Sequence, residues 1–194
     1  MIRPLFSSAY VKKRCDWAKD EPNITYHDEE WGIPEHHDQK LFEFLILEGA
    51  QAGLSWSTIL NRRNGYRNAF SNFDVIAVSK YTQNHVKKLI KNKAIIRNKL
   101  KINSAINNAK KFIEIQKQFG SFDEYLWGFV NHKSIQNKFK KYSDLPTHTV
   151  ISENLSNDLK KRGFTFVGPI ICYALMQAVG MVDDHTANCF KYSK

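Results

Sequence analysis

A carboxylate and a tryptophan lie near each other in a strongly apolar stretch, and both side chains can bind a ligand. The stretch LFEFLILEGAQAGLSWSTIL covers residues 41–60, and Glu48 places an acid in its apolar wall. A buried charge is costly unless it is paired or contacts a ligand. Ser55 is a good cap for a helix that begins at Trp56. We therefore predict a pocket in which Glu48 accepts hydrogen bonds and Trp56 forms an aromatic wall.

The same stretch has a plainer interpretation as a packing contact between two helices. Gly49 and Gly53 are four residues apart, so they leave one helix face without side chains. Another backbone or a flat ligand can then approach that face closely. In the packing interpretation, Glu48 reaches solvent and binds nothing. The stretch by itself is compatible with both interpretations.

Two cysteines and two histidines near the chain ends have the chemistry of a metal site. Cys15 and His27 lie near the N-terminus, and His185 and Cys189 lie near the C-terminus. Two thiolates and two imidazoles suit tetrahedral zinc, and four protein ligands leave no open position for a substrate. The pattern therefore favours a structural zinc ion over a catalytic one. The alternative is four unrelated residues.

The last two of these residues are predicted to share a helix face. His185 and Cys189 are four residues apart, and Asp183 or Asp184 can cap a short final helix that holds both. A metal bound to both chain ends would close a long loop and so constrain the unfolded chain. The third cysteine, Cys172, lies in an apolar segment and is predicted to be a core residue.

The charge of the chain favours a polyanionic partner. Its 194 residues contain 29 Lys and Arg against 19 Asp and Glu, which gives a net charge of +10. Such a charge attracts nucleic acid or an anionic membrane surface, although a basic surface can also be merely solvated. The longest apolar runs are too short to span a membrane, and the first residues do not resemble a signal peptide. We expect a cytoplasmic protein that does not enter membranes.

Helical periodicity is frequent along the chain and strand-type alternation is scarce, so we predict an all-α fold. Residues 14–40 are expected to be irregular. Predicted helices then cover residues 38–52, 56–70, 75–78 after the cap Asp74, 83–91 after Thr82, 97–119, 122–130 after Ser121, 153–162 after Ser152, and 169–179 after Gly168.

Four motifs together resemble one protein family. RCDWAKDEPNITYHDEEWG, LEGAQAGLSW, KKRGFTFVG and DDHTANC occur in the order typical of the 3-methyladenine DNA glycosylase I (Tag) family, in the helix-hairpin-helix superfamily. They cover nearly all of the chain from Arg14 to Cys189. The resemblance implies a two-lobed all-α globule with a helix-hairpin-helix element. It divides the chain into an N-terminal tail (1–13), a single glycosylase domain (14–190) and a C-terminal tail (191–194).

The resemblance also implies an activity and a metal. Such an enzyme flips 3-methyladenine out of alkylated double-stranded DNA, hydrolyses its N-glycosidic bond and leaves an abasic site, without lyase activity. We expect it to act as a monomer. One structural zinc ion would join the termini of the chain. By position, its ligands would be Cys15, His27, His185 and Cys189.

The base pocket implied by the resemblance contains Trp17, Tyr26, Trp31, Glu48 and Trp56. Glu48 would recognise the modified base. Methylation at N3 makes the adenine cationic, and a cation between aromatic faces is stabilised by the ring quadrupoles. A buried carboxylate beside the base adds Coulombic attraction. Trp31 is equally compatible with a role in the core.

DNA contacts are expected at two places outside the pocket. Leu54, at a turn between two helices, would fill the gap that the flipped nucleotide leaves, although it also suits a helix-end core position. The hairpin near Ala94, where relatives often have glycine, would approach a phosphate. The lysines and arginines around it suit a phosphate-binding face, with Lys93, Arg97 and Lys99 as the chosen contacts among Lys87, Lys88, Lys91, Lys93, Arg97, Lys99 and Lys101. The alternative for that cluster is a solvated helix surface.

Two further functions compete with the glycosylase. A zinc-stabilised DNA-binding module would keep the fold without the activity. A zinc hydrolase would need an open coordination position, which two cysteines and two histidines do not leave. The superfamily often places an Asp after the hairpin, whereas residues 91–105 contain no acid. The positive charge of the methylated base would then be the main activation of the leaving group.

Overall fold

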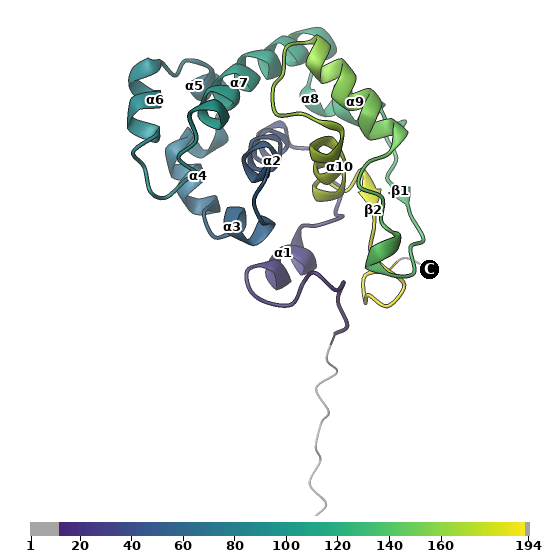
Figure 1. Cartoon of the computed structure of the whole chain (residues 1–194). Helices are drawn as coiled ribbons and strands as arrows, with labels where there is room; N and C mark the ends of the chain where they lie inside the picture. The colour runs from purple at the N-terminus through teal and green to yellow at the C-terminus, as the bar shows by residue number, and fades with distance from the viewer. Residues whose placement is uncertain (1–11, 193–194) are drawn as a thin grey trace, which may run out of the picture.

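Helix α2, Asp38–Gln51, runs through the middle of the molecule (Figure 1). The structure is a computed structural model that describes residues 12–192. Every residue of α2 from Leu41 to Ala50 is buried. A helix that is apolar on all sides is stable only when other elements surround it. The predicted helix over residues 38–52 is therefore confirmed, and it is central to the core.

The remaining elements are short, apart from one long helix. In chain order they are α1 (Asn23–Glu29), α3 (Trp56–Leu60), α4 (Arg63–Ala69), the 3-10 turn η1 (Ser71–Phe73), α5 (Val75–Ser79), α6 (Gln83–Leu89), α7 (Lys99–Phe119), α8 (Phe122–Gly128), β1 (Ile135–Gln136), the 3-10 turn η2 (Tyr142–Asp144), α9 (Val150–Lys161), α10 (Pro169–Ala178) and β2 (Val182–Asp183).

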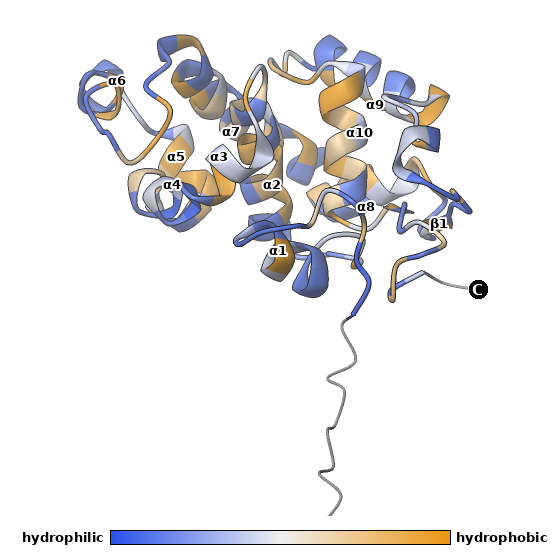
Figure 2. Cartoon of the chain, turned by 60° about the horizontal axis from the view of Figure 1, so that its bottom comes forward, coloured by the Kyte–Doolittle hydropathy of each residue, from blue (hydrophilic) through white to orange (hydrophobic). Residues whose placement is uncertain are grey.

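Two groups of elements lie on either side of α2. Helices α3 to α6 are on one side, and α9, α10 and the two short strands are on the other (Figure 1). Helix α10 packs against both α2 and α9, and it is mostly hydrophobic whereas α6 and α9 are largely hydrophilic (Figure 2). Strands β1 and β2 pair in parallel, with Ile135 opposite Val182. The fold is mainly helical, as predicted, with this strand pair as the exception.

Several helix ends match the predicted capping residues. Asp74 accepts a hydrogen bond from the amide of Ala77 at the start of α5, and Ser121 accepts one from Glu124 at the start of α8. Helix α10 begins with Pro169 after Gly168, where a missing N–H costs nothing. The long helix α7 begins two residues later than predicted, because Asn98 caps it by accepting from two backbone amides.

The predicted helix over residues 56–70 is wrong, because it breaks into α3 and α4. At the break, the Asn61 side chain donates to the carbonyl of Ser57, and Arg62 donates to the carbonyl of Thr58. The Ser57 carbonyl still accepts from the Asn61 amide, but the Arg62 amide donates to Ile59, so the Thr58 carbonyl lacks the backbone partner of a continuous helix. In α4, a side chain on Gly65 would overlap the backbone of Ala94. The break therefore places α4 directly under the 90–98 loop.

Three other local predictions need correction. Thr149, rather than Ser152, caps α9, and Ser152 bonds back to the amide of Thr149 from inside the first turn. Residues 14–40 contain a regular helix, α1, which the irregular prediction missed. The final helix over residues 185–189 does not form: after β2 the chain runs through turns. His185 and Cys189 therefore do not share a helix face.

The described residues include no helix that is long and apolar enough to cross a membrane. The predicted N-terminal tail falls mostly on residues 1–11, and residues 193–194 belong to the predicted C-terminal tail; both stretches lie outside the described residues. The division into two tails and one domain stays a prediction.

Candidate functional site

A pocket of about 480 Å³ lies among α1, α2, α3, α10 and the segment that contains η2. All five residues predicted for the base pocket line it. The full lining is Trp17, Tyr26, Trp31, Glu48, Gln51, Trp56, Tyr142, Ser143, Leu145, Pro146, Thr147, Ile170, Tyr173, Ala174 and Gln177. A largely apolar pocket with a few polar groups is the usual form of a small-molecule site.

Aromatic rings form one wall of the pocket. The ring centroids of Tyr26 and Trp56 are 5.2 Å apart, and those of Trp17 and Trp31 are 5.1 Å apart. Trp56 is the first residue of α3, where Ser55 caps the helix as predicted by accepting from Thr58. These rings present π-faces and edges within one cavity, which suits stacking against a flat or cationic ligand.

Glu48 is the acid of this pocket, and residues 12–192 give it no partner. Its side chain is 3% exposed, so the packing interpretation in which it reaches solvent is wrong. Among the described residues, its carboxylate makes no hydrogen bond or ion pair. Burial therefore raises the pKa of Glu48 to about 8. A carboxyl group left in this state gains stability when a ligand supplies a donor or a positive charge.

A second polar group in the same pocket is also unsatisfied. The Nε1 atom of Trp56 is buried and has no hydrogen-bond partner within residues 12–192. A buried donor without an acceptor costs about 1–3 kcal/mol. Such groups in natural proteins call for an explanation, and a polar ligand is one. The pocket thus combines one buried acceptor and one buried donor.

The opposite wall was not predicted from the sequence. Tyr173 and Gln177 lie four residues apart on α10, and both donate to Oδ2 of Asp184 at 2.7 Å. Asn137 donates to the other oxygen of Asp184 at 2.7 Å. Asp184 is completely buried. Two polar residues at helical spacing in an apolar helix were the available signal for this wall.

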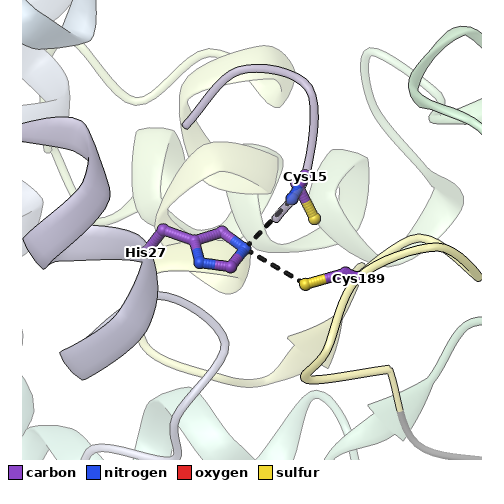
Figure 3. A group of neighbouring side chains, drawn as sticks. All are labelled: Cys15, His27 and Cys189. Atoms are coloured by element: carbon purple, nitrogen blue, oxygen red, sulfur yellow. Dashed lines mark hydrogen bonds between the residues drawn. The ribbon is translucent and has the colours of Figure 1, made fainter. Parts of the chain in front are cut away.

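A cluster of metal-ligand type lies beside the pocket. Cys15, His27 and Cys189 point toward one another from the N-terminal segment, from α1 and from the C-terminal segment (Figure 3). Their ligand atoms all lie within 4.8 Å of one another, and all three residues are buried. Nε2 of His27 is 3.3 Å from Sγ of Cys189. The structure therefore brings together three of the four predicted ligands.

A neighbouring carboxylate orients the histidine of this cluster. Nδ1 of His27 is 2.8 Å from Oδ1 of Asp28, and Arg14 in turn binds Asp28. A proton on Nδ1 leaves the Nε2 lone pair facing Sγ of Cys189 and the backbone amide of Cys15 (Figure 3), and metal-binding histidines are commonly oriented through Nδ1 in this way. The Asp28 pKa is lowered to about 2, chiefly by the hydrogen bond from Arg14, so this carboxylate stays charged.

His185 lies beside the cluster without being part of it. Its ring centroid is 5.0 Å from that of His27, and its Nδ1 is 2.6 Å from Oδ1 of Asp183. Its Nε2 is buried and has no hydrogen-bond partner among the described residues. The predicted reason for its role, a shared helix face with Cys189, is wrong. The unsatisfied Nε2 is an independent reason to consider it a ligand.

The two thiols of the cluster interact strongly with each other. A hydrogen bond with Cys15 lowers the pKa of Cys189 to about 4, and the same bond together with burial raises the pKa of Cys15. The pair therefore readily loses one proton. A soft divalent metal would remove the second, because thiolates rather than thiols are the ligands. The donor set of two sulfurs and one imidazole nitrogen fits zinc.

The residues predicted to contact DNA are exposed. Leu54 is 40% exposed and follows Gly53, whose φ of 77° lies in a region that L side chains rarely adopt. Lys93, Arg97 and Lys99 are exposed and form no ion pair with any described residue. Leu54 as a helix-end core residue is thus wrong, and the three cations are available for a phosphate.

Lys101 and Ala94 lie near the hairpin, and the structure bears on the predicted DNA contact of each. The Lys101 side chain, one of the predicted basic face, donates to the carbonyls of Ala50 and Ala52 at 2.8 and 2.7 Å. It therefore satisfies the end of α2 just before the Leu54 turn and is not available to DNA. Ala94 is not among the described non-glycine residues with positive φ, so alanine is tolerated at this turn.

Comparison with known proteins agrees with this geometry. A family model described as methyladenine glycosylase matches residues 17–192. The DNA-3-methyladenine glycosylase 1 of Escherichia coli (strain K12) is 44% identical over 181 residues, which are 93% of this chain and 97% of the relative. The DNA-3-methyladenine glycosylase of Haemophilus influenzae is 45% identical over 177 residues, which are 91% and 96% of the two chains.

Solved structures with similar folds carry the same name. A crystal structure of 3-methyladenine DNA glycosylase I has a TM-score of 0.91 at 43% identity and covers 93% of this chain and 100% of its own. A tyrosine-to-phenylalanine variant, solved in complex with 3-methyladenine, has a TM-score of 0.90 at 32% identity and covers 93% and 98%. Sequence motifs, fold and pocket agree: the chain belongs to the methyladenine glycosylase family, a family of hydrolytic enzymes.

Proposed function

We propose that the protein excises 3-methyladenine from alkylated double-stranded DNA by hydrolysing the N-glycosidic bond, which leaves an abasic site. The observation that carries this proposal is the buried, unpartnered Glu48 in an aromatic pocket. A relative that is 32% identical is solved with 3-methyladenine bound. Because an acid in an apolar cavity is costly, its presence favours a ligand with a donor or a positive charge.

The methylated base has the complementary chemistry. Methylation at N3 gives the nucleobase a positive charge, which weakens its bond to the sugar. Aromatic rings such as Tyr26 and Trp56 stabilise a cation through their quadrupoles. Glu48 loses its proton when a cation enters, because the opposite charge lowers a pKa that burial alone holds at about 8. An ordinary neutral adenine supplies no such compensation, so the pocket discriminates by charge.

The pocket favours simple hydrolysis over lyase chemistry. The described residues that line it include no lysine, and a lyase step needs an amine that attacks the sugar carbon. Residues 91–105 also contain no acid. Departure of an already cationic base requires little assistance, so water attacks a sugar on which positive charge develops. Glu48 serves mainly to recognise and hold the base.

Access to the pocket requires the nucleotide to leave the helix stack. We assign Leu54 as the wedge that fills the gap, since it is a large apolar side chain exposed at a tight turn. Leu54→Ala should reduce base release from duplex DNA and leave the binding of free 3-methyladenine unchanged. Base release is measured on methylated duplex DNA, and binding of the free base is measured by titration with tryptophan fluorescence as the signal. Equal loss of both properties would contradict the wedge.

We assign phosphate binding to the hairpin between α6 and α7. Lys93, Arg97 and Lys99 are exposed there without acidic partners in the described chain. Phosphate contacts of this kind position a protein on DNA without reading its sequence. The element has the order expected of a helix-hairpin-helix unit, with the loop over residues 90–98 as its hairpin.

We assign one structural zinc ion to Cys15, His27 and Cys189, with His185 as the fourth ligand. The buried, unsatisfied Nε2 of His185 supports its inclusion. The metal would tie the two chain ends together and supply no chemistry to the reaction. Metal analysis should find one zinc per chain, and Cys189→Ser should lower both zinc content and melting temperature.

Cys172 provides the control for this assignment. It is a free, buried cysteine outside the cluster, and its thiol donates to the carbonyl of Val167. Cys172→Ala should therefore leave the zinc content unchanged, whatever it does to stability. A Cys189→Ser protein that melts at the wild-type temperature would show that the chain ends do not need the metal.

The proposed activity is tested by identifying the base released from methylated duplex DNA. Chromatography should detect free 3-methyladenine after incubation with the purified wild-type protein. If the protein releases no base from any alkylated duplex, the proposal is wrong. Duplex binding that survives without release would support the competing function, a zinc-stabilised DNA-binding module.

A further inference from the structure

A second group of positive charges, unpaired among the described residues, lies in the segment that leads into the pocket lining. The segment over residues 133–141, called the lysine arm below, contains Lys133, Lys138, Lys140 and Lys141, and all four are exposed. It leads directly into Tyr142, which lines the pocket and is 52% exposed.

The lysine arm is held in place by backbone hydrogen bonds to the segment around β2. The amide of Ile135 donates to Met181 at 3.0 Å, and the amide of Asn137 donates to Asp183 at 3.1 Å. Further along, the carbonyl of Phe139 accepts from Ala187 at 3.0 Å. The charges on the arm thus start from a fixed backbone. A partner that binds them loses less conformational entropy than it would with a free tail.

The same segment is connected to the pocket wall through one buried acid. Asn137, in the arm, donates to Asp184, and Asp184 also accepts from Tyr173 and Gln177 in the pocket. A displacement of the arm would therefore disturb two residues that line the cavity. This connection ties the arm at Asn137 to the wall of the pocket.

The positive charges of the arm are not neutralised by the protein. None of its four lysines forms an ion pair with a described residue, whereas Lys40 and Lys111 do. The nearest acid in sequence is Asp144, which accepts a hydrogen bond from the backbone amide of Lys141. The lysine arm, which contains four lysines and no acid, therefore carries a net positive charge that a polyanion can neutralise.

A flipped nucleotide brings phosphates to this position. When a base occupies the pocket, its sugar lies at the mouth, and the two phosphates attached to that nucleotide lie immediately outside. Lys140 and Lys141 precede Tyr142, a residue of the pocket lining. The turn with Leu54 precedes α3, and the segment between β1 and α9, which contains η2, lies on the other side of α10 from α3 in Figure 1. The hairpin and the lysine arm thus flank the pocket on different sides.

We infer that the lysine arm binds phosphates of the DNA strand that carries the flipped nucleotide, on the side of the pocket across from the Leu54 turn. This inference rests on the proposed function, because it takes DNA as the substrate. Lys140 and Lys141 are the principal contacts. The hairpin and the arm then bind phosphates of the damaged strand on both sides of the pocket.

The test compares two double variants of equal charge. Lys140→Gln with Lys141→Gln removes two charges from the arm. Lys160→Gln with Lys161→Gln removes two adjacent, exposed lysines from the end of α9, which do not line the pocket. The probe is a short fluorescent duplex with a stable abasic-site analogue. Its dissociation constant is measured by anisotropy over a series of salt concentrations.

The expected result is a change in salt dependence that only the arm variant shows. Each lost phosphate contact reduces the magnitude of the slope of log K against log salt concentration by about 1. The slope of the arm variant should therefore be smaller in magnitude by about 2. The α9 variant should keep a slope close to that of the wild type. Equal slopes in all three proteins would overturn the inference. Equal losses in both variants would also overturn it, because that result reports net charge alone.

Two further measurements separate folding and catalysis from phosphate binding. Lys140→Arg with Lys141→Arg should restore the slope, and failure of this rescue would argue against a charge contact. If the wild type releases no base while the arm variant loses slope, the proposed function fails and the arm is still a DNA contact. If the wild type releases base while the arm variant keeps its slope, the arm inference fails alone.

Discussion

Helix α2 carries two glutamates, five residues apart, that are equally buried but differ in their ion-pair partners. Glu43 and Glu48 are each 3% exposed. Five residues rotate a helix by about 140° beyond a full turn, so the two carboxylates face different surroundings. Glu43 accepts from Arg63 and Arg67 at 2.8 Å and lies 3.3 Å from Lys40. Glu48 has no such partner in the described chain.

The pKa values of the two acids follow from this difference. Burial alone would raise the pKa of Glu43, but hydrogen bonds and charge from Arg63, together with Arg67 and Lys40, lower it. Burial is the only cause acting on Glu48, and it raises the pKa to about 8. A buried acid with partners is a structural element, whereas a buried acid without partners is a candidate for ligand binding. Burial alone therefore does not identify a site.

Among substitutions of these two glutamates, the largest expected effect is on catalysis and comes from Glu48. Glu48→Gln keeps the shape of the side chain and removes the charge that a cationic base requires. Loss of one preorganised electrostatic contact of this kind costs on the order of 100- to 1000-fold in rate. Release of 3-methyladenine from methylated duplex, measured under single-turnover conditions, should fall by that factor.

The Glu48→Gln protein should remain folded and keep its other properties. The substitution removes a buried acid that has no partner among the described residues, so the melting temperature of the variant at pH 7 should not fall. Its affinity for a duplex with an abasic-site analogue should also stay close to that of the wild type. A variant that releases base at the wild-type rate would show that Glu48 does not recognise the charge.

The second effect concerns stability and falls on the other glutamate. Glu43→Gln leaves Arg67 without its carboxylate and leaves Arg63 only with Glu30, whose two oxygens it contacts at 2.6 and 2.7 Å. Breaking a buried ion pair costs about 3 kcal/mol or more. Urea unfolding should show a loss of that size. The rate of base release per folded molecule should change little, and a stable but inactive protein would reverse the roles assigned here.

Helix α2 also shows what the sequence could and could not predict. Its extent was predicted from a long, strongly apolar stretch, because a helix buried on all sides depends on composition over many residues. The break after Asn61 was missed, since it depends on the Arg62 side chain, which bonds to the carbonyl of Thr58 while its own amide turns to Ile59. Local competition of this kind has no periodic pattern. The helix predicted over residues 185–189 was wrong for another reason: turns after β2 bring Cys189 to Cys15 and His27 without a helix.

The pocket was predictable in part for a comparable reason. Glu48 and Trp56 are close in sequence to glycines and to a helix start, so a local pattern indicated them. Asp184, which bonds to Tyr173, Gln177 and Asn137, was not indicated, because its partners come from segments far apart. The sequence also could not show that Glu43, rather than Glu48, would meet the arginines of α4. Long-range pairing decides which of two similar acids is left free.

The contrast between the two glutamates also predicts how stability depends on pH, and this can be tested on Glu48. Its pKa is about 8 in the folded protein, against a usual value of 4.5 in an unfolded chain. Between these values the folded protein holds a proton that the unfolded chain has released. The free energy of unfolding must then decrease as pH rises, by at most about 1.4 kcal/mol per unit, and level off above pH 8.

The difference between wild type and Glu48→Gln isolates this contribution, because all other groups cancel in it. Urea unfolding at pH 5 to 9 should show the wild type losing stability relative to the variant as pH rises toward 8, with a constant difference beyond. A difference that stays flat would mean that Glu48 titrates normally and has found a partner in solution. A difference that grows in the wild type's favour would mean that Glu48 is stabilised as a carboxylate, as Glu43 is, and the contrast between the two acids of α2 would disappear.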